Sequence, residues 1–149
     1  MGYILAVVGL GLMIGLPGAG SAIGLATGGS TVLGILKKKP EAFGMGLVLS
    51  GLPATQGLYG FVAFIMYNAG VNPEMSLFQG SVVFGAGLAV GLSCIVSAIQ
   101  QGKVCASGIS AIGSGHNVFG HTMILAAFPE FYAILALVAA ILMRGLLAV

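Results

Sequence analysis

The stretch MGYILAVVGLGLMIGLPGAGSAIGLATGGSTVLGIL, residues 1–36, contains no Asp, Glu, Lys or Arg. A helix rises about 1.5 Å per residue, so a helix over this stretch is long enough to cross the roughly 30 Å of hydrocarbon in a bilayer. Three later stretches are uncharged in the same way, at 42–73, 75–102 and 104–129. The sequence therefore predicts several membrane-spanning helices.

The composition indicates the same class of protein. Of the 149 residues, 58% are hydrophobic and only 5% are charged, whereas soluble domains carry about 25% charged residues. The net charge of +2 comes from too few groups to form the basic patch that nucleic-acid binding needs. The first charged side chain is Lys37. The N-terminus thus lacks the basic region of a signal peptide, and we expect the first apolar segment to be a retained span.

Short polar segments divide the chain into four expected helices. These segments are KKKPE at 37–41, NAGVNPE at 68–74 and GSGHN at 113–117. The helices are expected at about 4–34, 42–67, 76–111 and 117–146. The first and third are longer than a bilayer requires, so we expect them to tilt or protrude. Strands are not expected, because the alternation of a membrane barrel is missing.

The two halves of the chain resemble each other. A shift of 76 positions, without gaps, places Pro53 on Pro129. The same shift places Gly9, Gly11, Leu12, Gly15, Leu16 and Ser21 on Gly85, Gly87, Leu88, Gly91, Leu92 and Ser97. Such self-similarity indicates one structural unit used twice. We therefore predict an all-α membrane protein of two tandem helical hairpins, 1–73 and 74–149, in parallel topology.

The charges near the hairpin turns predict the orientation in the membrane. Lys37, Lys38 and Lys39 lie together in the first turn, and the positive-inside rule places such a loop in the cytoplasm. We therefore expect a multi-pass protein of the cell membrane, with both hairpin turns cytoplasmic and both termini outside. Arg144 lies near the outer end of the last helix, where we expect it to snorkel to the interface.

Glycine is abundant in the first and third expected helices. The chain has 26 glycines, and several recur at intervals of four: Gly11 and Gly15; Gly20, Gly24 and Gly28; Gly87 and Gly91. Small residues at this spacing let two helices approach closely. The pattern fits contacts within one chain and also contacts between copies in an oligomer.

One acid, Glu130, lies in the middle of the fourth expected helix. A charge at that depth costs a few kcal/mol or more, so such residues are rare and usually functional. The carboxylate must be protonated, paired with a cation or held by polar neighbours. A structural salt bridge to Lys103 is the simplest non-functional interpretation.

Polar residues of the second and third helices are expected at the same depth as Glu130. Four residues of the second helix share one helical face, because their spacing is i, i+3, i+4 and i+7: Leu52, Thr55, Gln56 and Tyr59. Gln101 lies about as far from the second turn as Glu130 does. Carboxylate, amide and hydroxyl oxygens suit a hard cation. A polar network that joins helices without an ion is the alternative.

Pro53 and Pro129 lie at equivalent points of the second and fourth helices. Each proline lacks a backbone donor and frees a carbonyl one turn back, which membrane helices tolerate where neighbours satisfy it. One interpretation is that each proline simply kinks its helix. The other is that the carbonyls freed in the second helix, near Pro53, become ligands of an ion.

Three segments carry a resemblance to a known family. They are LPATQGLYGF at 52–61, IQQGKV at 99–104 and AAFPEFYAIL at 126–135. With these segments and its duplicated hairpin, the chain resembles the proteolipid rotor subunit, c or K, of V-type ATPases over nearly its whole length. In that family, many identical subunits form a membrane ring that turns against a stator. ATP hydrolysis in a separate soluble head drives the rotation, so the resemblance implies a non-catalytic subunit.

The resemblance also implies the site. Sodium-pumping members use a Leu carbonyl, a Thr, two Gln and a Glu, which correspond here to Leu52, Thr55, Gln56, Gln101 and Glu130. Tyr59 is then placed to hydrogen-bond the carboxylate. Proton-pumping members generally lack the Thr-Gln pair, so the resemblance implies Na⁺, with H⁺ as the alternative. Pro129 departs from the sodium-type pattern.

The implied partners are identical subunits, a stator subunit that supplies an arginine, central-stalk subunits and membrane lipid. Ala54 occupies the position equivalent to Glu130 in the first hairpin, so each chain is expected to carry one ion. Two other classes of protein fit part of the pattern. A small four-helix cation-coupled antiporter also has few charges and one buried acid, and a purely structural membrane scaffold would need no Glu130.

Overall fold

Helices account for nearly all of the computed structural model, which describes residues 1–148, and no strand occurs among these residues. The elements are α1 (Gly2–Leu36), η1 (Pro40–Ala42), α2 (Phe43–Gly51), α3 (Ala54–Asn68), α4 (Leu77–Gly113), α5 (Phe119–Met143) and η2 (Arg144–Ala148). Four segments are long and apolar enough to cross a membrane: Gly2–Leu36, Pro40–Asn68, Leu77–Gly113 and Phe119–Ala148. The predicted all-α class with four spans is confirmed.

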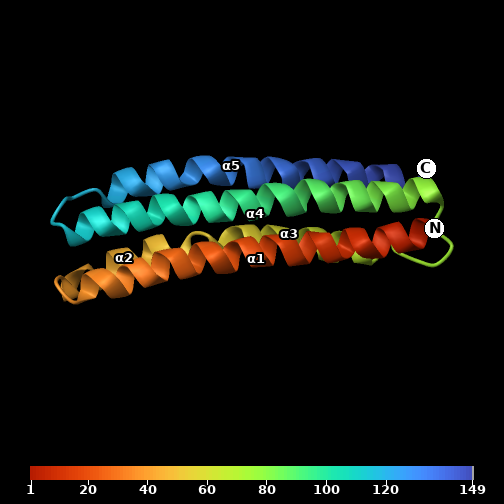
Figure 1. Cartoon of the computed structure of the whole chain (residues 1–149). Helices are drawn as coiled ribbons and strands as arrows, with labels where there is room; N and C mark the ends of the chain where they lie inside the picture. Colours follow the sequence, from red (N-terminus) through yellow and green to blue (C-terminus); the bar gives the residue numbers. More distant parts are fainter. Residues whose placement is uncertain (149) are drawn as a thin grey trace.

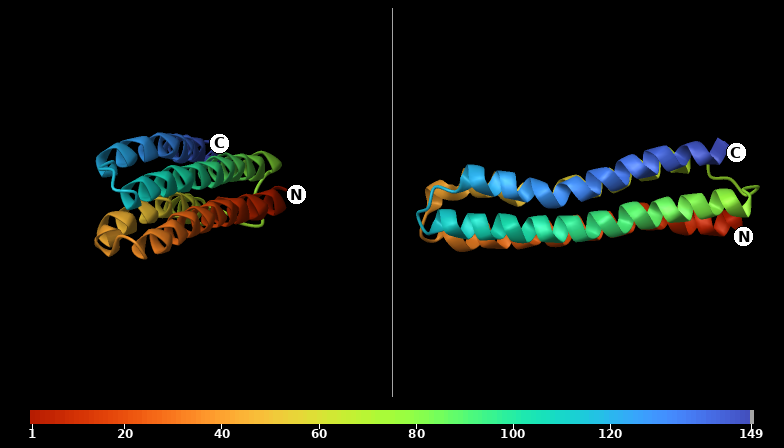
Figure 2. Two further views of the ribbon diagram at one scale, coloured as in Figure 1. Left: turned by 60° about the vertical axis from the view of Figure 1, so that its left-hand side comes forward. Right: turned by 90° about the horizontal axis from the view of Figure 1, so that it is seen from above.

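The helices run alongside one another, with α1 and α4 as the central pair (Figure 1). The segments α2 and α3 pack on α1, and α5 packs on α4. Both hairpin turns lie at one end of the molecule, and both termini lie at the other (Figures 1 and 2). The two hairpins are therefore parallel, as the 76-residue repeat predicts. The connection between α3 and α4 spans residues 69–76, and the division between residues 73 and 74 stays a prediction.

The two central helices, α1 and α4, are much longer than a membrane crossing requires. Helix α1 has 35 residues and α4 has 37, which corresponds to about 50–55 Å at the standard rise. Both exceed the thickness of the hydrocarbon core. The start of α4 is fixed by a capping box, because Ser76 Oγ accepts from Gln79 N while Gln79 Oε1 accepts from Ser76 N, both at 3.1 Å.

The second predicted span, at about 42–67, corresponds to the segment Pro40–Asn68, and its helix is interrupted at Leu52 and Pro53. Pro53 has no N–H to donate. The Leu49 carbonyl instead accepts from Leu52 N at 3.4 Å, and the Leu52 carbonyl accepts from Thr55 N at 3.2 Å. Pro129, its repeat counterpart, lies inside the continuous helix α5. The last predicted helix also ends earlier, at Met143, and continues as the 3₁₀ turn η2.

Glycine permits the close contact between α1 and α4. A Cβ added to Gly24 would lie 2.5 Å from the Ala98 carbonyl oxygen and 2.6 Å from Pro53 Cβ, and one added to Gly20 would lie 2.6 Å from Ile95 Cα. The backbones could not approach so closely with any larger residue. A second set of glycines on α1 behaves differently, because nothing lies within 4 Å of the Cβ position of Gly11, Gly15 or Gly18.

The two hairpin turns are also tied together. Lys39 Nζ donates to the Ile112 carbonyl oxygen at 3.2 Å, near the end of α4. A cation at this position satisfies one of the last carbonyls of the helix and interacts favourably with its dipole.

Gly24→Val tests the contact between α1 and α4. The new side chain meets the backbone of α4 and the Pro53 ring, which have little room to move, so we expect a loss of at least about 1–3 kcal/mol. Thermal unfolding in detergent measures the change. The control is Gly34→Val in the same helix, which has nothing within 4 Å and should unfold within about 0.5 kcal/mol of the parent. Equal stability of the two variants would contradict this packing.

Candidate ion-binding site

Glu130 is held by side chains from two other helices. Its Oε1 accepts a hydrogen bond from the Tyr59 hydroxyl of α3 at 2.8 Å, and its Oε2 accepts one from Gln101 Nε2 of α4 at 3.0 Å. Glu130 is half-buried within the single chain. The depth expected from the sequence is therefore its depth in the membrane, not complete burial inside the protein. Hydrogen bonds to an ionised carboxylate are roughly twice as strong as neutral ones, and these two fix its position.

Two glutamines extend the network from the carboxylate to α3. Gln101 and Gln56 are both fully buried. Gln56 Nε2 donates to Gln101 Oε1 at 2.9 Å, and Gln101 Nε2 also donates to the Ala126 carbonyl at 2.9 Å. Among residues 1–148, no buried side-chain nitrogen or oxygen lacks a partner. The amides are therefore oriented by their bonds, and their carbonyl oxygens point into the network.

Thr55 and Leu52 complete the expected set at the break between α2 and α3. Thr55 Oγ1 lies 3.2 Å from Gln56 Oε1 and 3.1 Å from the Leu52 carbonyl, and its one hydrogen serves either oxygen. The five residues expected as ligands thus lie in one connected group with Tyr59. The carbonyl freed by Pro53 is that of Leu49, which Leu52 N occupies. The Leu52 carbonyl itself faces Thr55.

Ser97 is a member of this group that the sequence reasoning did not single out. Its Oγ accepts from Gln56 Nε2 at 3.0 Å and donates to the Pro129 carbonyl at 2.8 Å. It lies one turn before Gln101 on α4, and this i, i+4 spacing on one helical face is the signal that could have identified it. Ser97 joins α3, α4 and α5 through one oxygen.

The donor set is chemically uniform. Every candidate ligand is an oxygen: one carboxylate, two amides, one hydroxyl and one backbone carbonyl. Within residues 1–148, no three His, Cys, Asp or Glu side chains gather, so a single carboxylate supplies the only negative charge of the group. Such a set suits a hard monovalent cation better than a soft or highly charged one.

Two alternative interpretations of Glu130 are a structural salt bridge to Lys103 and a polar network without an ion. Lys103 is exposed on α4, and the carboxylate oxygens are bonded to Tyr59 and Gln101 instead, which leaves no support for a structural salt bridge. The polar network between helices does exist. A network of neutral groups would join the helices without the cost of an acid, so the carboxylate needs a further explanation.

The site is not centred along the central helices. Gln101 lies 24 residues from Leu77, where α4 begins, and 12 residues from Gly113, where α4 ends. These separations correspond to about 36 and 18 Å. The carboxylate is therefore nearer to the hairpin turns than to the termini.

Comparisons with known proteins agree with this architecture. The profile of the family described as the ATP synthase C subunit matches residues 8–67 and 84–143, two segments with the same 76-residue offset. The K subunit of the A-type ATP synthase of Methanocaldococcus jannaschii is 38% identical over 140 residues, which cover 94% of this chain and 61% of that protein.

Two further relatives differ in the ion that their names state. The K subunit of the V-type sodium ATPase of Enterococcus hirae is 37% identical over 115 residues, or 77% of this chain and 74% of that protein. The 16 kDa proteolipid of the human V-type proton ATPase is 23% identical over 118 residues, or 79% of this chain and 76% of that protein.

Two parallel membrane hairpins that share one carboxylate site define a multi-pass proteolipid with a duplicated hairpin. The sequence profile makes the assignment specific, since it covers both hairpins. The chain belongs to the ATP synthase C-subunit family, and its relatives include K subunits of A-type and V-type ATPases. The resemblance stated from the sequence is confirmed.

Ser97→Ala tests the network around the site. The change leaves the Gln56 amide and the Pro129 carbonyl each without one buried partner, which should cost about 1–3 kcal/mol. The measurement is thermal unfolding in detergent. Ser93→Ala, one turn earlier on the same helix, removes a hydroxyl outside this network and serves as the control. If both serine variants unfold alike, Ser97 does not hold the site together.

Proposed function

We propose that this chain is a rotor-ring subunit that carries Na⁺ across the membrane, coupled to ATP hydrolysis by a rotary V-type ATPase. The observation that carries the proposal is the direct link from the Glu130 carboxylate through Gln101 and Gln56 to Thr55. The chain is a non-catalytic part of the pump, and ATP hydrolysis belongs to other subunits. The membership of the chain in its family leaves the antiporter and the scaffold without support.

The proposed ligands are the Leu52 carbonyl, Thr55 Oγ1, Gln56 Oε1, Gln101 Oε1 and the Glu130 carboxylate. Gln56 Oε1 and Gln101 Oε1 accept hydrogen bonds from neighbouring side chains, at 3.2 and 2.9 Å, and the Leu52 carbonyl and the Glu130 carboxylate accept hydrogen bonds as well. A bound cation takes the place of the donors to the two amide oxygens, because it is coordinated by the same oxygen lone pairs. Binding then amounts to rotation of the Thr55 hydroxyl and the Gln56 amide, while Tyr59 keeps hold of the carboxylate.

Sodium is favoured over the proton by the Thr55-Gln56 pair and by the relatives. The relative whose name states sodium is 37% identical, and the human relative whose name states a proton is 23% identical. A proton on Glu130 also neutralises the carboxylate without using the other ligands. H⁺ is therefore the competing cargo, and the two ions should exclude each other.

The proposed cycle follows from the cost of charge in lipid. With Na⁺ or H⁺ bound, the site is neutral and can face hydrocarbon. Without either, the Glu130 carboxylate is an uncompensated anion, which is expensive at that depth. It should move only beside a cation, which we assign to an arginine of the stator subunit. Arg144 of this chain is too near the end of α5 to serve.

The wider assembly follows the same proposal. Identical subunits form the ring, and the central-stalk subunits bind at the end that carries the two turns. We place the chain in the cell membrane, with the turns cytoplasmic and both termini outside, because Lys37, Lys38 and Lys39 lie in the first turn. The only acid of the hairpin at 1–73 is Glu41, which lies at its turn, and the hairpin at 74–149 carries Glu130.

Glu130→Gln tests the role of the carboxylate. The amide is neutral and similar in size, so the chain should still insert and assemble, whereas Na⁺-dependent transport by the assembled complex should be lost. In the unmodified protein, carbodiimide should label Glu130. Na⁺ should slow the labelling more at neutral than at acidic pH, because protons compete for the carboxylate as pH falls. Labelling that is unaffected by Na⁺ at every pH would favour the proton as cargo.

Gln101→Ala and Thr55→Ala test the ligand set. Each change removes one neutral oxygen and keeps the carboxylate, so Na⁺ affinity should weaken by about 1–3 kcal/mol, roughly tenfold or more. The readout is the Na⁺ concentration at half-maximal ATPase activity of the assembled complex. Thr27→Ala is the control, because the Thr27 hydroxyl bonds only to the Ile23 carbonyl of its own helix. An unchanged half-saturating concentration in both site variants would remove these residues from the ligand set.

A further inference from the structure

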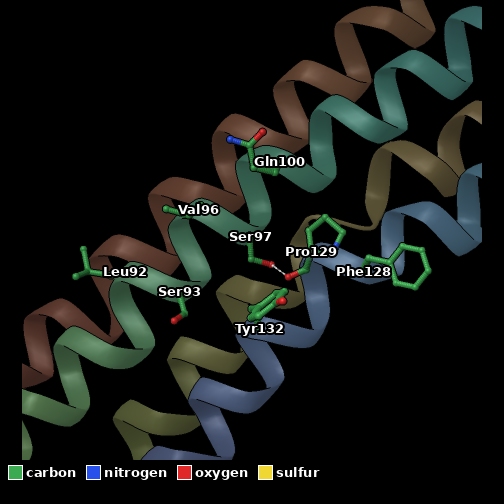
Figure 3. A pocket seen from close by; sticks show the side chains of 8 residues that line it. All are labelled: Leu92, Ser93, Val96, Ser97, Gln100, Phe128, Pro129 and Tyr132. Carbon is green, nitrogen blue, oxygen red and sulfur yellow. Dashed lines mark hydrogen bonds between the residues drawn. The ribbon is translucent and has the colours of Figure 1, made fainter.

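Ser97 of α4 is a buried hydroxyl between the candidate ion-binding site and the helix that carries Glu130. Its side chain is only 4% exposed. Ser97 Oγ donates to the Pro129 carbonyl of α5 at 2.8 Å, as Figure 3 shows, and accepts from Gln56 Nε2 of α3 at 3.0 Å. Ser97 is not one of the proposed ligands, so any effect on a bound ion acts through the residues to which it bonds.

The Pro129 carbonyl fixes the direction of both hydrogen bonds. A serine hydroxyl has one hydrogen to donate, and a carbonyl oxygen can only accept, so the hydrogen of Ser97 points to Pro129. Ser97 can then only accept from Gln56, which must turn its amide nitrogen toward the serine. The Gln56 amide oxygen therefore faces the other way, where Thr55 Oγ1 lies at 3.2 Å.

The other glutamine of the site, Gln101, is oriented without an intermediate residue. Its Nε2 donates directly to the Ala126 carbonyl at 2.9 Å and to Glu130 Oε2 at 3.0 Å. A carbonyl and an ionised carboxylate can only accept, so the Gln101 oxygen must point away from them, toward Gln56. Helix α5 thus orients one glutamine directly and the other through Ser97.

A bound cation makes the contact between Ser97 and Gln56 more important. Within the chain, Gln56 Nε2 donates to two acceptors, Ser97 Oγ and Gln101 Oε1. A cation on Gln101 Oε1 displaces the second of these hydrogen bonds, and Ser97 then holds the Gln56 nitrogen away from the ion. Without Ser97, the amide can turn its NH₂ group toward the cation, which hydrogen-bond donors repel and only oxygens bind.

A proton makes no such demand on Gln56. It binds to the Glu130 carboxylate alone, whose two oxygens are hydrogen-bonded to Tyr59 and Gln101. Neither Ser97 nor Gln56 donates to that carboxylate. The orientation of the Gln56 amide therefore matters for the affinity of the site for Na⁺ and has little influence on its affinity for H⁺.

We propose that Ser97 is a positioning residue that sets the preference of the site for Na⁺ over H⁺. It holds the Gln56 amide so that the oxygen, and not the nitrogen, faces the ion. The inference rests on the proposed function, and it adds a determinant of ion choice that lies outside the ligand set.

The first hairpin contains the same serine with a different partner. Ser21 of α1, the repeat counterpart of Ser97, accepts from the backbone N–H of Gly57 at 2.8 Å. That contact leaves the hydrogen of Ser21 uncommitted, and a serine in this state can face either end of a glutamine amide, because it can accept from nitrogen or donate to oxygen. The Pro129 carbonyl removes this choice from Ser97. The partner on α5 therefore decides which end of Gln56 the serine accepts.

Carbodiimide labelling of Glu130 in the assembled complex tests the role of Ser97. In Ser97→Ala, the Na⁺ concentration that halves the labelling rate at neutral pH should rise about tenfold, the effect of one poorly placed ligand. The pH dependence of labelling without Na⁺ should match that of the unmodified protein, whereas a general loosening of the site would change both measurements.

Ser97→Thr should restore the Na⁺ affinity, because it keeps the hydroxyl. A groove of about 600 Å³ between α4 and α5 borders Ser97 and has room for the added methyl group. Ser93→Ala is the control, because Ser93 lines the same groove but makes no contact with Gln56; its half-protecting Na⁺ concentration should stay within about twofold of the parent.

A double-variant cycle tests whether Ser97 acts through Gln56. If it does, Ser97→Ala should change the half-protecting Na⁺ concentration by less than about twofold when Gln56→Ala is already present, because coupled residues do not contribute additively. An equal loss in both backgrounds would show that Ser97 acts by another route. Should Ser97→Ala fail to assemble, Ser97→Cys replaces it. Cysteine is close in size and its thiol bonds only weakly, so its Na⁺ affinity should lie between those of the serine and alanine forms.

The outcomes separate this inference from the proposed function. An unmodified complex that Na⁺ protects, together with parental Na⁺ affinity in Ser97→Ala or Ser97→Cys, overturns the inference and leaves the proposed function intact. The same holds for an assembled Ser97→Thr complex that binds Na⁺ no better than Ser97→Ala. An unmodified complex that Na⁺ does not protect at any pH overturns both.

Discussion

The absence of water in the bilayer core is the constraint on which the structure depends, because every polar group there must find its partner inside the protein. No buried side-chain nitrogen or oxygen of residues 1–148 is left without one. The break at Pro53 shows how strictly this holds. Helix α3 restarts with free N–H groups, and Ser21 Oγ of α1 accepts from Gly57 N at 2.8 Å. Its repeat counterpart Ser97 bonds at the equivalent proline in a different way, because it donates to the Pro129 carbonyl within the continuous helix α5.

The architecture could be predicted from the sequence because it follows from charge and repetition. Uncharged stretches define the four spans, and the 76-residue shift defines two parallel hairpins. The interruption at Leu52 and Pro53 could not be predicted in the same way. Pro53 and Pro129 are equivalent in the repeat, yet only the first separates two helices. The two prolines have different neighbours, since Pro53 packs against Gly24 of α1 whereas the Pro129 carbonyl accepts from Ser97 of α4, and such contacts between helices are not visible in local sequence.

A residue of the site could be predicted from the sequence where its side chain is unusual for a membrane helix, and could not be predicted where its side chain is common there. An acid or a glutamine in a membrane helix is unusual, so Glu130, Gln101 and Gln56 stood out. A serine is not unusual, because it can bond to its own helix one turn back, as Ser107 does to the Lys103 carbonyl. Ser97 bonds across helices instead. Only the three-dimensional arrangement of α3, α4 and α5 separates the two cases.

The off-centre position of Gln101 on α4 divides the path of a charge unequally. About two thirds of the helix lies between the site and the termini, and one third between the site and the turns. Moving one elementary charge through a full membrane potential involves about 2.3 kcal/mol per 100 mV. Where that potential falls evenly along α4, roughly two thirds of the electrical work belongs to the leg on the side of the termini. Voltage then acts about twice as strongly on exchange at the side of the termini as on exchange at the side of the turns.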